Sequence, residues 1–225
     1  MKLLEGKVVI ITGAKGGLGT FVTEAFLAAG ARVAGVSRSI SPSDFPHPEF
    51  TAMPAELSSG DAARTLSDQV NERFGRIDAL VHVMGGFAGG QSVADTDDAT
   101  LEKMLDLNYR SAFYLARAVL PRMRAHGGGR ILAVASRQAA EPAAMTAAYS
   151  ASKAALVALI RTIALENKDR CISANTVLPG TMDTPSNHGP QLVQPSQVAS
   201  MLVHLASDAG AQVTGAAIPI YGNQV

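Results

Sequence analysis

Short runs of apolar residues alternate along the chain with longer segments in which apolar positions recur every three or four residues. The first pattern is typical of buried strands and the second of helices. Most predicted strands are apolar along their whole length, as in a parallel sheet covered on both faces. We therefore expect an α/β fold: a doubly wound parallel sheet of about seven strands with helices on both faces. The predicted strands cover residues 8–12, 32–37, 50–55, 79–84, 130–135, 172–178 and 216–221, and the predicted helices cover 21–29, 61–74, 97–124, 146–165 and 195–206.

Glycines and prolines mark the ends of these elements. Gly30 is a natural residue to follow a helix C-terminus, and Pro121 predicts a kink or break near the end of helix 97–124. Pro219 favours an edge position for the last strand, because proline cannot donate a ladder hydrogen bond. No linker or fixed-period repeat interrupts the alternation. Residues 1–225 are therefore expected to form a single domain, with a substrate loop at about 181–194.

Composition narrows the functional class. Of the 225 residues 47% are hydrophobic, and 19 basic residues balance 19 acidic ones. A net charge of zero leaves no electrostatic footprint for nucleic acid or for a membrane surface, and we predict neither as a partner. The N-terminus has no signal-peptide stretch and no apolar run has transmembrane length, so the expected location is the cytoplasm.

The chain has one cysteine, Cys171. It cannot form an internal disulfide and has no metal-ligand partners at useful spacing, so we predict no metal site. Because it opens a buried strand, we interpret it as a small core residue.

A glycine-rich loop, residues 12–19, follows the first predicted strand and opens the first helix. It reads TGAKGGLG. Glycines there let the backbone approach a pyrophosphate, which binds the free N–H groups at the helix N-terminus. Such a turn can also be purely structural, but its place between strand and helix favours a dinucleotide site. The predicted cofactor contacts in this loop are Gly13, Lys15, Gly16, Gly17, Leu18 and Gly19.

The charge near the end of the second strand bears on which dinucleotide binds. An acidic residue there would bind the ribose 2′-hydroxyl of NAD and repel a 2′-phosphate. The position holds Ser37, followed by Arg38, and Lys15 lies in the glycine loop. Two cations around a phosphate-sized space favour NADP(H) over NAD(H), because guanidinium pairs well with phosphate. The alternative is that both are ordinary solvated charges.

The most informative side chains are Tyr149 and Lys153, with Ser136 upstream. Tyr149 and Lys153 lie one turn apart on one face of the predicted helix 146–165. An ammonium beside a phenol favours the phenolate, so Lys153 is expected to lower the pKa of Tyr149. Such a phenol can act as a general acid or base on an alcohol oxygen. Ser136 ends a buried strand and can donate to the same oxygen, although a tyrosine–lysine spacing alone also occurs by chance.

Together the motifs resemble those of the short-chain dehydrogenase/reductase family over nearly the whole chain. Four occur in order: TGxxxGxG, an asparagine in the helix before the serine strand, Ser…YxxxK, and PGxxxT after the sixth strand. Each is weak alone, but four in the right structural context are specific. The resemblance implies a Rossmann-type fold, a nicotinamide cofactor and oxidoreductase activity. The matching residues are Thr12, Gly13, Gly17, Gly19, Asn108, Ser136, Tyr149, Lys153, Pro179, Gly180 and Thr184.

The resemblance also implies a role for each catalytic residue. Tyr149 gives a proton to the carbonyl oxygen during reduction, or accepts one from the alcohol during oxidation. Ser136 polarises the substrate oxygen. Lys153 lowers the pKa of Tyr149 and hydrogen-bonds the nicotinamide ribose. Asn108 holds a water that links Lys153 to solvent. The carboxamide end of the cofactor is expected to contact Pro179, Gly180, Thr181 and Thr184.

The segment after the fourth strand departs from the family. Where many members have Asn-Asn-Ala-Gly, this chain has His82-Val83-Met84-Gly85. We expect backbone contacts to the adenosine side of the cofactor to persist through Gly85. We interpret His82 as a packed core residue rather than a catalytic base.

The second departure is a short substrate lid. Only residues 185–194 separate Thr184 from the helix that begins near Pro195, and family members usually have a longer, partly helical lid. In this the chain resembles dihydropteridine reductases, which however lack the serine. A short lid predicts an open pocket and a substrate that is bulky and flat or poorly defined by the lid. The candidate pocket residues are Phe87, Arg137, Gln138, Met145 and Met182.

These observations predict an NADP(H)-dependent enzyme that interconverts a carbonyl and a secondary alcohol. One alternative is a pteridine- or quinone-type reductase acting on a flat substrate. Another is a non-catalytic NADP(H)-sensing regulator, although such relatives usually lose the tyrosine or lysine. Family members usually pair through the helices that carry Tyr149 and Asn108, so we expect a homotetramer or homodimer. Ala154, Ala158 and Ile160 suggest an apolar outer stripe for this contact.

Overall fold

The computed structural model describes residues 2–183, 189 and 191–222. Within them, seven parallel strands form one sheet in the order β3-β2-β1-β4-β5-β6-β7. This confirms the predicted α/β, Rossmann-type fold. The strands are β1 (Val8–Thr12), β2 (Arg32–Ser37), β3 (Phe50–Pro54), β4 (Ala79–His82), β5 (Gly129–Val134), β6 (Ile172–Pro179) and β7 (Ala217–Ile220).

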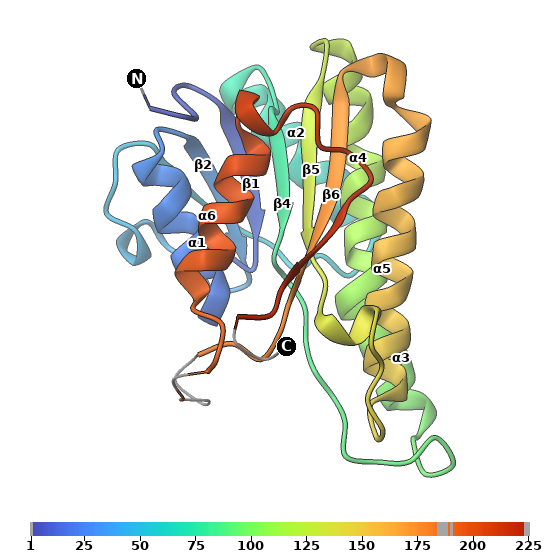
Figure 1. Cartoon of the computed structure of the whole chain (residues 1–225). Helices are drawn as coiled ribbons and strands as arrows, with labels where there is room; N and C mark the ends of the chain where they lie inside the picture. Colours follow the sequence, from blue (N-terminus) through green and yellow to red (C-terminus); the bar gives the residue numbers. More distant parts are fainter. Residues whose placement is uncertain (1, 184–188, 190, 223–225) are drawn as a thin grey trace.

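Two apolar cores sandwich the sheet because its central strands are apolar on both faces. In β1, Val9 and Ile11 face one core and Val8 and Ile10 face the other. Helices α1 (Gly17–Ala28) and α6 (Pro195–Ala206) cover the first face. Helices α2 (Gly60–Phe74), α4 (Ser111–Ala125) and α5 (Ala147–Glu166) cover the second (Figure 1).

The strand order reverses at β1, which lies between β2 and β4. At such a switch point the connections leave in opposite directions and open a crevice beyond the carboxyl ends of the strands. Thr12, the last residue of β1, is in register with His82 at the end of β4. The glycine loop, Gly85, Ser136 and Gly180 all follow strand ends, so the sheet gathers them along one edge.

Two helices differ from their predicted bounds by more than one residue. Helix α1 begins at Gly17 rather than at residue 21, because glycines give no hydrophobic period to recognise. The predicted helix 97–124 is divided into α3 (Asp98–Leu105), a π-turn (Asp106–Arg110) and α4. The predicted break at Pro121 is wrong: α4 continues through it to Ala125, although proline has no N–H to donate to the carbonyl four residues earlier.

Three further predictions need correction. Cys171 is exposed with a φ of 54°, because it forms a left-handed turn before β6 rather than part of the strand. Ile160 is 2% exposed and faces the core, so it is no part of an outer stripe. One described helix, α5, is long and apolar enough to cross a membrane, but its buried face packs on the sheet as a core helix does. The edge position of β7 is confirmed.

Candidate active site

Helix α5 brings Tyr149 and Lys153 to the carboxyl edge of the sheet. Ser136 follows β5 and precedes a short 3-10 turn, Arg137–Ala139, which packs against the first turns of α5. The connection between this turn and α5 extends below the sheet before it returns (Figure 1). The fold therefore places Ser136 opposite Tyr149, as the motif predicts.

The hydrogen bonds of Ser136 orient its hydroxyl. The backbone N–H of Gln138 donates to Ser136 Oγ over 3.2 Å. Ser136 also hydrogen-bonds the Tyr149 phenol, which lowers the pKa of Tyr149. Because Oγ already accepts one bond, its own hydrogen is available for the phenol oxygen or for a substrate oxygen. Both hydroxyls can therefore reach one oxygen position.

Burial dominates the acidity of Tyr149. The side chain is largely enclosed, and desolvation raises the pKa of the phenol more than the Ser136 hydrogen bond lowers it. The prediction that Lys153 lowers this pKa is not met in the structure. Instead Lys153 Nζ donates to the backbone carbonyl of Val134 over 2.8 Å. A buried ammonium needs an acceptor, and the carbonyl at the end of β5 supplies one.

Lys153 itself is almost completely buried, with 5% of its surface exposed. Desolvation lowers the pKa of its ammonium to about 8. The group is thus still mostly protonated at neutral pH, close to its titration point. Its positive charge is therefore held against the Val134 carbonyl.

Asn108 lies in the π-turn and is fully buried. Its Oδ1 accepts from the backbone N–H of Gly86 over 2.9 Å, and its Nδ2 donates to the Gly86 carbonyl and to Ser152 Oγ, each over 3.0 Å. The side chain therefore clamps the loop after β4 to helix α5. Both hydrogens of the side-chain amide are donated within the protein. The predicted water would therefore have to donate to an oxygen of Asn108, either Oδ1 or the backbone carbonyl.

Gly85 has to be glycine in this arrangement. A Cβ at this position would lie 2.7 Å from Asn108 Oδ1 and 3.1 Å from Lys153 Nζ. Lys153 and Asn108 therefore approach the same point of the backbone, and a side chain would separate them. This explains why the glycine is present although the residues before it depart from the family pattern.

The glycines of residues 12–19 differ in what a side chain at each position would contact. Gly13 has a φ of 66°, and a Cβ there would lie 2.9 Å from the Met84 nitrogen. A Cβ at Gly19 would lie 1.9 Å from the Gly13 carbonyl oxygen. At Gly17, by contrast, a built Cβ would meet open space: apart from its chain neighbours and the adjoining helix backbone, no atom of the described residues lies within 4 Å. Packing therefore requires Gly13 and Gly19, whereas Gly17 leaves space for something outside the protein.

That space fits the pyrophosphate of a nicotinamide dinucleotide. It adjoins the N-terminus of α1, which has no capping side chain and no acidic residue in its first turn. The free N–H groups and the helix dipole there favour an anion. The backbone of residues 13–19 could hold the phosphates, as the motif predicts.

The predicted cation pair beside the second strand is only partly free. The Lys15 backbone N–H donates to Ser37 Oγ over 3.3 Å, so these two predicted contacts are brought together. The Lys15 ammonium pairs with Asp44 over 2.8 Å and holds the pKa of that carboxyl below its usual value. Arg38 is exposed and makes no ion pair with any residue that the structure describes. Arg38 is thus a cation with an unused charge.

The sixth strand leads into the predicted carboxamide-binding segment. Pro179 ends β6, and the Gly180 N–H donates to the Ile220 carbonyl over 2.9 Å. The Val193 N–H donates to the Thr181 carbonyl over 2.9 Å, which joins the start and end of the substrate loop. Thr184 and residues 185–188 and 190 of the predicted lid lie outside the described residues.

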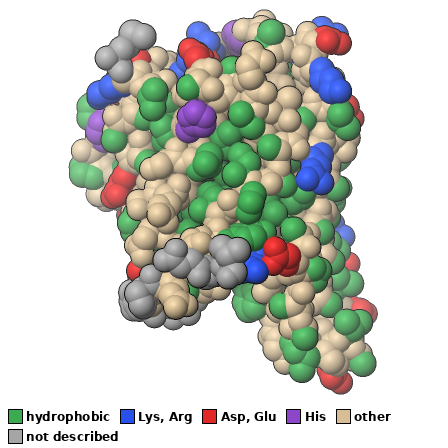
Figure 2. All heavy atoms as spheres, viewed as in Figure 1, with side chains coloured by type: hydrophobic (Ala, Val, Ile, Leu, Met, Phe, Trp, Pro, Cys, Tyr) green, Lys and Arg blue, Asp and Glu red, His purple; other side chains and the backbone are tan. Residues whose placement is uncertain are grey.

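An apolar arm flanks Tyr149. The Phe87 ring packs edge-on against the Tyr149 ring, with 4.9 Å between centroids, yet 64% of Phe87 remains exposed. The Gly90 N–H donates to the Met145 carbonyl over 2.8 Å, which joins the loop after β4 to the segment before α5. These joined loops project below the sheet and carry exposed hydrophobic side chains (Figures 1 and 2). Phe87 and Met145, which is 52% exposed, are thus available to a substrate.

The two polar pocket candidates, Arg137 and Gln138, differ in whether their polar groups have partners within the protein. Arg137 pairs with Glu141 over 2.7 Å and lies 4.7 Å from the centre of the Tyr221 ring, so its charge is compensated. Gln138 Oε1 is shielded from solvent and has no hydrogen-bond partner in the described part of the chain. A donor group on a ligand could satisfy it. Met182, the remaining pocket candidate, is half-buried in the stem of the substrate loop.

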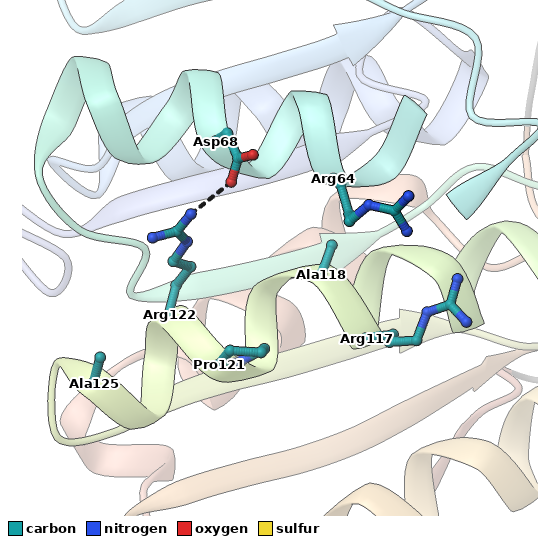
Figure 3. A pocket seen from close by; sticks show the side chains of 7 residues that line it. All are labelled: Arg64, Asp68, Arg117, Ala118, Pro121, Arg122 and Ala125. Atoms are coloured by element: carbon teal, nitrogen blue, oxygen red, sulfur yellow. Dashed lines mark hydrogen bonds and ion pairs between the residues drawn. The ribbon is translucent and has the colours of Figure 1, made fainter. Parts of the chain in front are cut away.

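A groove of about 620 Å³ lies elsewhere, between α2 and α4 (Figure 3). Its lining includes Arg64, Arg117 and the ion pair between Arg122 and Asp68, at 2.6 Å. It contains none of the predicted catalytic or cofactor-binding residues, and we assign it no part in the reaction.

Two contributors to the site were not predicted. Ser152 links Asn108 to α5 and donates to the Tyr149 carbonyl over 2.7 Å. Its position inside the YSASK motif was an available signal, because it lies next to Lys153. Asp44 belongs to a proline- and serine-rich loop, and no local pattern indicated its pairing with Lys15.

Known proteins of one family match this geometry. A family model described as short chain dehydrogenase matches residues 7–192. Short-chain dehydrogenase/reductase olcF of Penicillium canescens is 31% identical over 250 aligned positions, covering 98% of this chain and 97% of its own. D-threitol dehydrogenase of Mycolicibacterium smegmatis is 31% identical, with 97% and 93% covered.

Solved structures agree. The crystal structure of gox2181 superposes with a TM-score of 0.91 at 26% identity, covering 97% of this chain and 95% of that one. A candidate short-chain dehydrogenase/reductase from Burkholderia xenovorans gives 0.92 at 28% identity, covering 99% and 97%. The olcF alignment spans 250 positions although this chain has 225 residues, so that relative contains segments that this chain lacks.

Proposed function

Because the chain belongs to the short-chain dehydrogenase/reductase family, we propose that it is an NADP(H)-dependent oxidoreductase that interconverts a carbonyl compound and a secondary alcohol. The observation that carries the proposal is that Ser136, oriented by the Gln138 N–H, lies close enough to the Tyr149 phenol to lower its pKa, so both hydroxyls can serve one substrate oxygen. Enzymes of this family use nicotinamide cofactors. A related chain is named for its action on an alcohol, D-threitol.

Tyr149 acts in this mechanism as the proton donor or acceptor. A substrate carbonyl oxygen accepts hydrogen bonds from Tyr149 and Ser136, and gains negative charge as the carbonyl is reduced. The phenol then gives up its proton to that oxygen. The raised pKa of Tyr149 keeps the phenol in its protonated form at neutral pH, so in the reductive direction it has a proton to give. When bound, the nicotinamide supplies the hydride.

Lys153 and Asn108 support this proton transfer. The ammonium of Lys153 binds the Val134 carbonyl in the structure and would hydrogen-bond the nicotinamide ribose once the cofactor is bound. Asn108 holds the loop at Gly86 and, through Ser152, helix α5, so the π-turn, the loop after β4 and the helix that carries Tyr149 and Lys153 keep a fixed separation. The proposed proton path from Lys153 to solvent passes by Asn108.

The cofactor contacts follow from the fit of the glycine loop. Residues 13–19 and the N-terminus of α1 would bind the pyrophosphate, and Gly85 would lie along the adenosine side. We assign Arg38, with Lys15 and Ser37, to the 2′-phosphate, because Arg38 has an unpaired charge at the right strand end. Pro179, Gly180, Thr181 and Thr184 would contact the carboxamide end.

The substrate is a neutral, flat and largely apolar carbonyl compound. Phe87 and Met145 form an apolar wall beside Tyr149, and the charge of Arg137 is compensated by Glu141. The short substrate loop supports a pocket open enough for a bulky ring system. The same wall favours a quinone- or pteridine-type substrate as the second candidate, since both are planar.

The decisive experiment compares the wild type with Tyr149→Phe. NADPH oxidation is measured with an aryl ketone, a quinone and a quinonoid dihydropteridine, and NADPH binding is measured by its fluorescence. Tyr149→Phe is expected to lower turnover of the ketone by about 100-fold or more while NADPH affinity stays within about twofold. Tyr149→Phe turning over the quinone at the wild-type rate would favour quinone reduction instead. Wild-type protein that binds NADPH but reduces none of these would favour the sensor.

A further inference from the structure

His82 is a buried titratable residue that the proposed chemistry does not use. It ends β4, is 1% exposed, and stands where many relatives have asparagine. Both ring nitrogens have partners from other elements. The imidazole therefore bridges parts of the site rather than merely filling the core.

One bridge reaches the glycine loop. His82 Nδ1 lies 3.0 Å from Thr12 Oγ1, in the residue that ends β1 and opens the loop. Thr12 Oγ1 also accepts from the Met84 N–H over 3.2 Å. With that acceptance made, the hydroxyl hydrogen of Thr12 is free to be donated to Nδ1.

The other bridge reaches the π-turn. His82 Nε2 lies 3.4 Å from Ser111 Oγ, the first residue of α4. Ser111 Oγ donates to the Leu107 carbonyl over 2.9 Å, so its hydrogen is used and it can only accept from the imidazole. The network therefore assigns the proton of His82 to Nε2. The opposite tautomer would leave the Thr12 hydroxyl without an acceptor among the described contacts.

A second series of hydrogen bonds connects the glycine loop to the π-turn by way of the loop after β4. Met84, bonded to Thr12, is two residues before Gly86, and Gly86 is bonded to Asn108. Asn108 in turn follows Leu107, which accepts from Ser111. The path from Thr12 through His82 to Ser111 thus closes a ring around the loop after β4. Without His82, the hydrogen bonds between this loop and the π-turn in the described part of the chain would be those of Asn108 with Gly86.

We propose that His82 is a positioning residue: as its Nε2–H tautomer it ties the cofactor-binding glycine loop, through Thr12, to the π-turn that holds Asn108. The proposal rests on the proposed function in that Asn108 and the glycine loop serve proton transfer and cofactor binding. The bridge itself depends only on the hydrogen bonds. It couples the placement of the cofactor to the placement of the proton path.

The bridge as assigned has a neutral imidazole. A second proton would make Nδ1 a donor, so Thr12 Oγ1 would have to turn its hydrogen away and accept from Nδ1 as well as from the Met84 N–H. Burial, and then the charge of Lys153, lower the pKa of His82 to about 3. Among the described residues, the charged group that shifts the pKa of His82 is Lys153 on α5. Its positive charge makes a second positive charge on the imidazole unfavourable. His82 therefore stays in its bridging form at neutral pH.

Two variants separate the halves of the bridge. In His82→Asn the amide oxygen replaces Nδ1 toward Thr12, but the side chain is too short for Ser111. In His82→Gln the amide nitrogen replaces Nε2 toward Ser111, but the bond to Thr12 is lost. His82→Asn should speed hydrogen exchange in residues 106–111 and leave NADPH affinity within about twofold. His82→Gln should instead speed exchange in residues 84–86 and weaken NADPH binding about fivefold, the factor expected for one lost hydrogen bond.

The matched control is Ser111→Ala. It should speed exchange in residues 106–111 at least as much as His82→Asn, because it also removes the bond to the Leu107 carbonyl. Adding His82→Asn to Ser111→Ala should change exchange in these residues no further, since the link between His82 and Ser111 is already broken. Nitrogen NMR of the wild type should show His82 with a protonated Nε2 and a bare Nδ1. The proposal is overturned if Nδ1 carries the proton, or if both variants loosen both segments and NADPH binding alike. None of these readouts needs turnover, so an enzyme inactive with every carbonyl would contradict the proposed function without touching this result.

Discussion

At the scale of single residues, the cations around the site differ in how their charge is used. Lys15 is paired with Asp44, Lys153 is buried against a carbonyl, and Arg38 has no ion-pair partner among the described residues. An unpaired exposed guanidinium is well suited to a phosphate that arrives with a ligand. Arg38 is therefore tested by its effect on cofactor binding, and Lys153 by its effect on stability.

Arg38→Asp tests the cofactor preference. Reversing this charge should weaken NADPH binding about tenfold or more, because a carboxylate repels the 2′-phosphate. NADH binding should change little. Fluorescence titration with each cofactor measures both, with Arg161→Asp, at an exposed position of α5, as the charge-matched control. Equal losses for NADPH and NADH would show that Arg38 supports the fold instead.

Lys153→Met tests the cost of burying an ammonium. The folded-state pKa of Lys153 is about 8, against 10.5 for the free side chain. The unfolded chain therefore binds more protons between these values, and wild-type stability should rise as the pH rises from about 8 to 10.5. Removing the ammonium should raise the free energy of unfolding at pH 7 by up to about 3 kcal/mol, while turnover is lost.

Urea denaturation at a series of pH values from neutral to alkaline measures this effect. Lys153→Met should lack the alkaline rise of the wild type, and Lys103→Met, at an exposed position of α3, should keep it. A Lys153→Met protein less stable than wild type at every pH would mean that the bond to the Val134 carbonyl outweighs desolvation.

At the scale of elements, the loops after β1 and β4 each depend on glycine for a different reason. Gly17 opens α1 and has no protein atom near a built Cβ, whereas Gly85 has no room for one between Asn108 and Lys153. Gly17 leaves room for a ligand, whereas Gly85 leaves room for the side chains of Asn108 and Lys153. One methyl group at each position distinguishes these reasons.

Gly17→Ala and Gly85→Ala should have opposite effects on stability. Alanine at Gly17 should leave the fold as stable or stabilise α1 by about 0.5–1 kcal/mol, yet weaken NADPH binding. Alanine at Gly85 should destabilise the protein by about 1–3 kcal/mol and lower turnover at saturating NADPH. Thermal unfolding and NADPH titration measure both variants. Unchanged NADPH affinity in Gly17→Ala would contradict the pyrophosphate assignment.

At the scale of the whole molecule, several exposed side chains of α4 and α5 are apolar. Phe113 and Leu165 are 37% and 64% exposed, and Ala154 and Ala158 lie exposed on α5. Small residues between larger apolar ones allow two such faces to approach closely. We propose that the chain forms a homotetramer or homodimer through this face.

Replacing Ala154 and Ala158 together by arginine should break that assembly. Both positions are exposed, so the fold should survive, while charge and bulk should prevent contact between helices. Sedimentation velocity should show a smaller species than the wild type, and Glu72→Arg on the outside of α2 should show no change. A double variant that sediments like the wild type would place the interface elsewhere.

The sequence by itself determined the strands, the glycine loop and the candidate catalytic residues. Strand β1 and helix α6 have the predicted bounds, because uninterrupted apolar runs and clear helix caps are local signals. The edge position of β7 followed from Pro219, since a missing N–H is a property of one residue. The motifs placed Ser136, Tyr149 and Lys153 together because strand ends share one edge of a parallel sheet.

Tertiary structure alone decided the contacts between distant segments and the charges that depend on burial. The pairing of Lys15 with Asp44, the clamp of Asn108 on Gly86, and the bridge of His82 between Thr12 and Ser111 join residues far apart in sequence. The pKa of Tyr149 is raised rather than lowered because desolvation depends on what surrounds the phenol, which spacing along a helix does not show. The sequence shows which titratable groups are present. Their exposure to solvent and their hydrogen-bond partners are decided only when distant segments pack together.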